Sequence, residues 1–189
     1  MPENTIFLAD PYVRVSDVQR LVRPLRPLDK GHHRHTPVQQ VMLSSRSVLA
    51  FAVSEIKRGS DHTAWFFRTA AENILGQYYE YWQSDNSGSQ WKLIQLYLHL
   101  FEDKGRTEKP DEVFTLHCEP QEVADSHNSR MKRGPHVHVV RAGYPLGRAH
   151  FPLNLGHINE VLKTLGTLTA ALDSAIQITQ AEVIEAKWT

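Results

Sequence analysis

Apolar residues follow helical spacing in the first part of the chain. Thr36 is a favourable N-cap, and apolar residues then recur at intervals of three and four up to Gly59. Asp61 is placed to cap a second helix, whose apolar stripe runs from Phe66 to Trp82. Because the turn between the two segments is very short, the pattern predicts an antiparallel helical pair.

From residue 91 the apolar spacing changes to strict alternation. Between Trp91 and Phe101 the even positions Ile94, Leu96, Leu98 and Leu100 are aliphatic, and the odd positions include Gln95, Tyr97 and His99. Three later segments, 113–118, 136–140 and 148–153, repeat this alternation. Since consecutive strands usually lie side by side, we expect a four-stranded antiparallel meander.

Helical spacing returns after Gly156 and continues to the end of the chain, which predicts a long C-terminal helix. Residues 24–36 contain prolines, a glycine and a histidine run, and are typical of a connector. The predicted fold class is therefore α+β, with an N-terminal helical pair, a four-stranded antiparallel meander and a long C-terminal helix. Residues 1–36 are predicted to form an N-terminal arm and connector, and residues 37–189 a single α+β domain.

Composition adds little to the pattern except through histidine. The 189 residues include 21 basic and 21 acidic side chains, which is ordinary for a globular domain. No apolar run is long enough to span a bilayer and no secretory signal is visible, so we expect a cytoplasmic protein. The single Cys118 excludes an intramolecular disulfide. Eleven histidines are the unusual feature.

Each predicted strand carries its histidine on the face opposite the aliphatic residues. Neighbouring strands lie about 4.8 Å apart and alternate residues of one strand about 6.7 Å apart, so several imidazoles could converge on one atom or one phosphate. The predicted histidine face consists of His99, His117, His136, His138 and His150.

Two kinds of chemistry suit such a face. In the first, His136 and His138 ligate a metal ion, Zn²⁺ fitting best, with His150 or His117 as the third ligand and an open position for water. In the second, two imidazoles act as general base and general acid without a metal, and Arg148 or Arg141 stabilises the developing charge. The predicted metal ligands are His136, His138 and His150, and the predicted catalytic residues are His136, His138, His150, His117 and Arg148.

A basic segment precedes and follows these histidines. Residues 128–150 contain five arginines and lysines and no acid. This excess of positive charge favours an anionic partner, either a small molecule or RNA, whose bases an aromatic ring could stack. The predicted substrate-binding residues are Arg130, Lys132, Arg133, Arg141 and Tyr144.

Together these features predict a hydrolase of a phosphodiester or other anionic substrate, such as a ribonuclease-like enzyme, that uses the histidine face. Two alternatives stay open from the sequence alone. One is a non-enzymatic binding or assembly protein that forms a homo-oligomer or binds a protein partner. The other is a metal-binding regulatory module.

Overall fold

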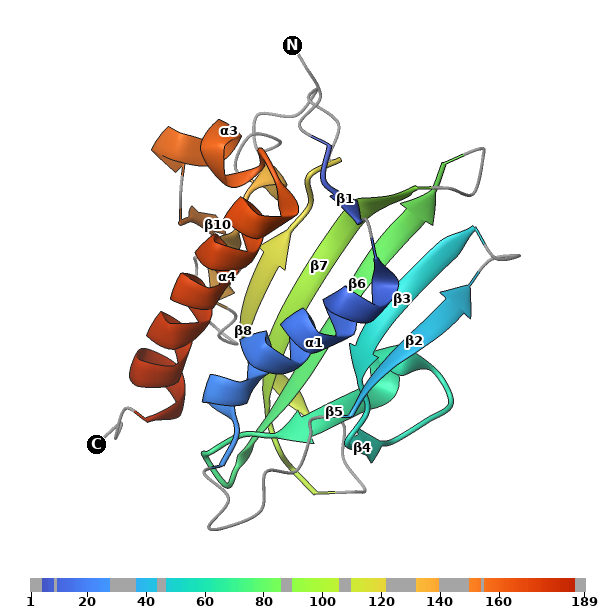
Figure 1. Ribbon diagram of the computed structural model, residues 1–189. Helices are drawn as coiled ribbons and strands as arrows, with labels where there is room; N and C mark the ends of the chain where they lie inside the picture. Colours follow the sequence, from blue (N-terminus) through green and yellow to red (C-terminus); the bar gives the residue numbers. More distant parts are fainter. Residues whose placement is uncertain are drawn as a thin grey trace.

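The fold is a large antiparallel sheet with helices across one of its faces (Figure 1). The computed structural model describes residues 5–8, 10–27, 37–43, 47–85, 90–105, 110–121, 132–139, 150–153 and 155–185. Its ten strands are β1 (Phe7–Leu8), β2 (Val38–Leu43), β3 (Val48–Val53), β4 (Ile56–Lys57), β5 (Trp65–Arg68), β6 (Ile74–Ser84), β7 (Trp91–Glu102), β8 (Asp111–Cys118), β9 (His136–Val139) and β10 (His150–Pro152).

The main path of the sheet runs in the order β10-β9-β8-β7-β6-β3-β2. Three short strands lie off this path: β1 pairs with β7, β4 pairs with β5, and β5 also pairs with β6. Along the main path and at each of these side pairings the neighbours are antiparallel. Long strands at the centre therefore provide a wide platform for side chains on both faces.

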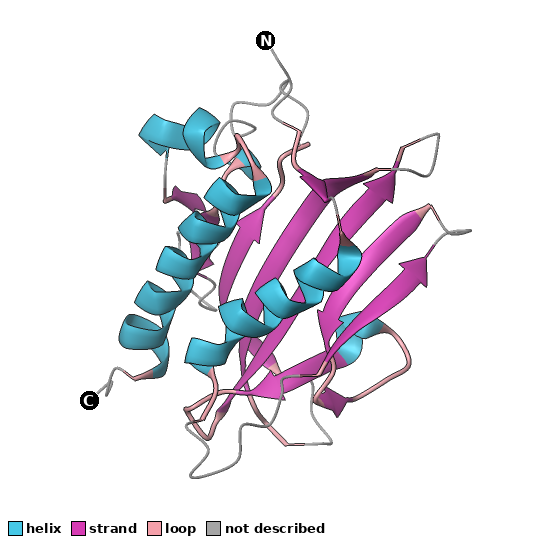
Figure 2. Ribbon diagram, viewed as in Figure 1, coloured by secondary structure: helices cyan, strands magenta, loops and turns pink. Residues whose placement is uncertain are grey.

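Two helices, α1 (Pro11–Val22) and α4 (Leu165–Thr179), lie on the same face of the sheet (Figures 1 and 2). Asp10 caps α1 by accepting a hydrogen bond from the Tyr12 backbone N–H at 2.8 Å. Thr164 forms a capping box at the start of α4. The described helices include none with the length and apolar character to cross a membrane. The shorter helical segments are η1 (Arg23–Leu25), η3 (His62–Ala64), η4 (Leu155–His157), α3 (Ile158–Val161) and the π-helical turn η5 (Gln180–Ile184).

The hydrophobic core fills the space between the sheet and these helices. Alternate residues of the central strands point into it, as the period of two requires. Their fully buried aliphatic partners from the helices include Val18, Leu21, Leu168 and Leu172. The inward-facing strand residues are Leu49, Phe51, Val53, Tyr78, Trp82, Leu93, Leu96, Leu98, Leu100, Phe114, Leu116 and Cys118.

The predicted helical pair is wrong, because its two segments form strands β2 to β6. Val38 pairs with Val53 in β2 and β3, where the first helix was expected. Strand β3 is buried on both faces, with Ala50 and Ala52 at 0% exposure like Phe51 between them. A short apolar run of this kind has no period that distinguishes a strand from a buried helix.

Strand β6 misled the prediction for a different reason. Its core-facing positions include Glu80, which is fully buried between Tyr78 and Trp82. A charged residue in the apolar series breaks the alternation, while the aromatic residues around it fit a helical stripe equally well. The tertiary partners of Glu80, which the sequence does not reveal, make this position compatible with a core strand.

The predicted four-stranded meander is also wrong as a description of the sheet. Strands are present in those segments, as β7 to β10, but they make up one end of a ten-stranded sheet. The long C-terminal helix is present as α4, and it begins at Leu165 after a separate short helix, α3. Helix α1 lies in the segment that was expected to be an arm, and no helix was predicted there.

Strand β5, in the segment between β3 and β6, packs very close to β6. Phe67 in β5 pairs with Gly76 in β6, and a Cβ at Gly76 would lie 2.1 Å from the Phe67 ring. Glycine is therefore required where the two strands meet. This close approach holds β5, and the η3 turn before it, against β6.

Candidate metal centre

Polar side chains, most of them aromatic rings or imidazoles, form two rows across the sheet on the face away from α1 and α4. The rows follow from strand register, because residues that pair across antiparallel strands point to the same face. The first row, from β6 to β9, is Tyr79, Tyr97, His117 and His136. The second row is Gln77, His99, Thr115 and His138.

Three imidazoles converge at the β8–β9 end of these rows. His117 comes from β8, and His136 and His138 come from β9. One ring nitrogen from each lies within 4.8 Å of the corresponding nitrogens of the other two. The ring centroids are 4.5 Å apart for His117 and His138, 5.0 Å for His136 and His138, and 5.6 Å for His117 and His136. We call these three residues the histidine cluster.

Burial and a backbone contact fix the orientation of the central ring. His136 is fully buried, and its Nδ1 lies 2.9 Å from the Gly134 carbonyl oxygen. A carbonyl only accepts, so Nδ1 carries the proton and Nε2 of the neutral ring carries a lone pair. The Nε2 atoms of His117, His136 and His138 are all shielded from solvent. In His136, a proton on Nδ1 leaves Nε2 able to bind a metal ion.

A carboxylate lies beside the histidine cluster. The Glu112 carboxylate accepts hydrogen bonds from His99 Nδ1 and from the Thr115 hydroxyl. These contacts, that of His99 first, outweigh partial burial and hold the pKa of Glu112 below its ordinary value. The His99 ring centroid is 5.4 Å from that of His117. Glu112 is therefore an anion close to the cluster at neutral pH.

Tyr97 in β7 lies beside His117 and borders the histidine cluster on that side. Its ring is edge-on to His117, with centroids 4.3 Å apart. Its hydroxyl donates to Glu119 Oε1 at 2.7 Å, and Gln95 Oε1 lies 3.0 Å from the same hydroxyl oxygen. Burial, and then the hydrogen bond to Glu119, raise the pKa of Tyr97 well above its ordinary value. Tyr97 is therefore a neutral phenol at physiological pH.

The structure brings together three of the predicted site residues, His117, His136 and His138. His150 pairs with His138 in the β9–β10 register, but its side chain lies outside the described residues, so its predicted role stays a prediction. Lys132 and Arg133 lie just before β9, where Arg133 Nε donates to the Pro120 carbonyl at 3.3 Å. The other predicted residues, Arg130, Arg141, Tyr144 and Arg148, also lie outside the described part of the chain.

Sequence reasoning missed Glu112, which lies beside the cluster, and Tyr79, whose ring stacks on His99 on the same face of the sheet. Glu112 shares the sequence parity of Phe114, a core residue, yet it contacts His99 on the opposite face. The pairing register of β7 and β8 shifts between Leu100 and Phe101, and this irregularity changes the face that Glu112 occupies. Tyr79 was missed because β6 was taken for a helix. No signal in the alternation marks the shift in register.

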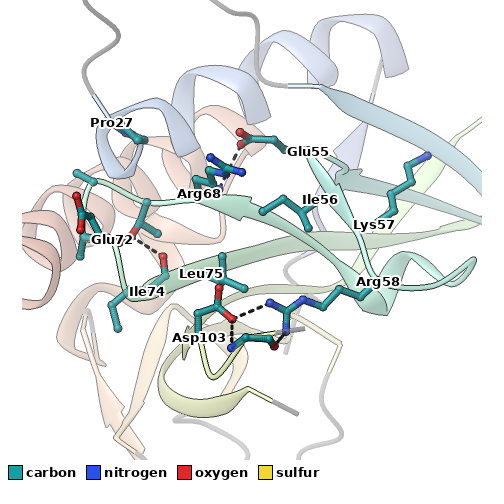
Figure 3. Close-up of a pocket in the computed structure, with 14 residues that line it drawn as sticks. Pro27, Glu55, Ile56, Lys57, Arg58, Arg68, Glu72, Ile74, Leu75 and Asp103 are labelled. Carbon is teal, nitrogen blue, oxygen red and sulfur yellow. Dashed lines mark hydrogen bonds and ion pairs between the residues drawn. The ribbon is translucent and has the colours of Figure 1, made fainter. Parts of the chain in front are cut away.

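A separate hollow opens at the end of the sheet near β4, β5 and the start of β6 (Figure 3). Two ion pairs involve its lining residues: Arg58 lies 2.7 Å from Asp103, and Glu55 lies 2.9 Å from Arg26. Figure 3 shows the Arg58 side chain reaching across to Asp103. These matched pairs are typical of ion pairs that hold loops together.

The Arg58–Asp103 pair predicts a pH dependence of stability. The hydrogen bond from Arg58 holds the pKa of Asp103 below its ordinary 3.8. A depressed pKa in the folded state contributes stability above the ordinary pKa, and this contribution is lost as the pH falls through the folded-state value. We expect Asp103→Asn to be less stable than the wild type to urea at neutral pH, and the difference to vanish in acid. A difference that is constant with pH would contradict this expectation.

Three imidazoles from two adjacent strands form, in their neutral form, a donor set suited to Zn²⁺, Cu²⁺ or similar transition metals. Comparison of the chain with family models, curated proteins and solved structures gave no match in any of the three. A fold by itself does not assign a function, which depends on the arrangement of particular side chains.

Proposed function

We propose that this protein is a metal-dependent hydrolase whose histidine cluster binds one divalent transition metal ion, most simply Zn²⁺. The ion would activate water for attack on a phosphodiester or another anionic ester. The observation that carries the proposal is the convergence of ring nitrogens from His117, His136 and His138 within 4.8 Å of one another.

The separation of the nitrogens is compatible with metal binding after a small adjustment. Zinc–nitrogen bonds are about 2.1 Å, which places tetrahedral ligand atoms about 3.4 Å apart. Because the nitrogens are at most 4.8 Å apart, each ring needs to move inward by no more than about 1 Å when the ion binds. His117 and His138 are only partly buried, so rotation of their side chains can supply this movement. His136, held by Gly134, would act as the fixed ligand.

A metal ion explains the arrangement better than two imidazoles acting alone as acid and base. Acid–base catalysis needs one ring protonated, and a positive charge in a buried cluster is disfavoured by desolvation. The neutral His136 tautomer instead offers a lone pair. Lone pairs from three rings suit a cation, which also attracts an anionic substrate.

Three protein ligands leave a coordination position for water, as in catalytic zinc sites. Zinc lowers the pKa of a bound water to about 7 and polarises a phosphoryl or carbonyl oxygen. The anionic Glu112, held by His99 and Thr115, lies on the same face and would orient groups around the ion. The sequence-based choice of an anionic substrate rests on the basic segment 128–150, most of which lies outside the described residues.

A second candidate function is a metal-binding regulatory module without hydrolytic activity. Burial of all three Nε2 atoms favours it, since closed sites are typical of structural and sensing metals. The two candidates share the same ligands. They differ in whether a substrate can reach the ion.

The test is metal loading of protein stripped with a chelator. We expect one Co²⁺ or Zn²⁺ to bind per chain, with the visible absorption of Co²⁺ in a tetrahedral nitrogen site. Hydrolysis of bis(p-nitrophenyl) phosphate should be absent from stripped protein and restored by the metal. Binding without hydrolysis would support the regulatory module, and failure to bind either ion would overturn both candidates.

A further inference from the structure

A second group of titratable side chains lies in the η3 turn, away from the histidine cluster. The phenol oxygen of Tyr81 in β6 lies 2.5 Å from Nε2 of His62. The other ring nitrogen of His62, Nδ1, lies 3.1 Å from a carboxylate oxygen of Asp61. A hydroxyl, an imidazole and a carboxylate therefore follow one another, which is the order of a nucleophile, its base and an orienting acid.

The turn that carries His62 is held firmly against β6. Gln77 donates its side-chain amide to the Thr63 carbonyl at 2.6 Å, and Asp61 Oδ1 accepts from the Thr63 N–H at 2.9 Å. The His62 ring is 6% exposed and packs edge-on against Tyr79 and Tyr81, with centroids 5.9 and 5.2 Å away. The geometry is thus set before any ligand arrives.

The protonation states suit transfer of a proton from Tyr81 to His62. Burial lowers the pKa of His62 despite the nearby Asp61, so the ring is a neutral base at neutral pH. The charge of Asp61 favours a proton on Nδ1, which leaves the Nε2 lone pair facing the phenol. Burial, and then Asp61, raise the pKa of Tyr81, so the phenol stays protonated unless a base accepts its proton.

We propose that Tyr81 is a nucleophilic tyrosine that accepts an acyl group from an uncharged carboxylic ester, with His62 as its base. Tyr81 is only partly buried and the Asp61 side chain is 65% exposed, so the group lies at the surface. The Asp61 carboxylate would repel an anionic ester. This is why the proposed substrate is uncharged, unlike that of the histidine cluster.

In the proposed step, a bond forms between Tyr81 Oη and the acyl carbon. The bond between that carbon and the ester oxygen breaks. The phenol proton passes to His62 Nε2 and then to the departing alkoxide or phenolate. Asp61 stabilises the transient imidazolium. The product is an O-acyl tyrosine, and no metal or redox reagent takes part.

The test is acetylation of the full chain by p-nitrophenyl acetate in the presence of a chelator, followed by peptide mass spectrometry. Tyr12 is the internal control, because it is 80% exposed on α1. We expect Tyr81 to be acetylated at least about tenfold faster than Tyr12 in spite of its lower exposure, since a positioned general base contributes about 100-fold or more.

Replacement of the base by glutamine separates chemistry from packing. His62→Gln keeps an acceptor for the phenol but cannot take up its proton, and should slow acetylation of Tyr81 by roughly 100-fold while leaving Tyr12 unchanged. If His62→Gln does not fold, Asp61→Asn, which keeps the cap on Thr63, should still slow Tyr81 by about tenfold. Equal labelling of Tyr81 and Tyr12, or labelling of Tyr81 that neither variant slows, would overturn the proposal.

Discussion

Replacing His117 and His138 together with alanine should reduce Zn²⁺ affinity by more than roughly 100-fold, the upper end of the loss on removing an outer-shell partner of a metal site. Both rings are partly buried, so their removal should leave the fold intact, which circular dichroism can confirm. His136 is kept because it is fully buried and hydrogen-bonded to Gly134, and its loss would also disturb packing. Calorimetric titration of stripped protein measures the effect, and phosphodiester hydrolysis should fall with metal occupancy.

Two further variants control this experiment. His157→Ala removes an imidazole that is 81% exposed and is not one of the three convergent rings, so it should leave zinc affinity unchanged. Comparison of His117→Ala with His150→Ala tests which residue completes the site. The proposal expects the larger loss from His117. Unchanged affinity in the double variant would contradict the assignment of these rings as ligands.

The sequence predicted the histidine face better than it predicted the fold around it. Between Leu96 and Leu100 of β7, between Phe114 and Cys118 of β8 and at Val137 of β9, apolar residues of one parity pack in or against the core, so parity alone placed His99, His117, His136 and His138 on the other face. Register, which decides that His117 lies beside His136, depends on hydrogen bonds between strands. Alternation in a single strand carries no information about register.

The N-terminal half could not be predicted in the same way. Strand β3 is apolar on both faces, and β6 places a glutamate in the core. Neither strand shows the alternation of a half-exposed sheet. Arg14 in α1, which makes Glu80 acceptable there, and Thr169 in α4, which accepts a hydrogen bond from Arg14, are distant in the chain. Predicting β6 as a strand required knowledge of those partners.

The Arg14–Glu80 pair should give the largest stability effect of any charged residue described here. Arg14 Nε lies 3.0 Å from Glu80 Oε2, and both side chains are at 0% exposure. Trp82 Nε1 and the Tyr78 hydroxyl also donate to this carboxylate. Burial alone would lower the pKa of Arg14, but Glu80 holds it above its ordinary value, so the guanidinium stays charged. Glu80→Gln would remove the buried counter-charge of Arg14 and leave only Asp17, which lies 3.7 Å away and is partly exposed, so it should cost about 3–5 kcal/mol in the free energy of unfolding.

A double variant shows whether the charge is the cause of this loss. In Arg14→Met/Glu80→Gln no charge is buried, although the single glutamine oxygen can accept from only one of Tyr78 and Trp82, which donate to different oxygens of Glu80, so part of the lost stability should return. Glu55→Gln is the matched control, because its ion pair with Arg26 is partly exposed and should contribute only about 0–1 kcal/mol. Urea unfolding of the four proteins measures these differences. If the double variant is less stable than Glu80→Gln, the pair stabilises the fold through packing and hydrogen bonds rather than through charge compensation.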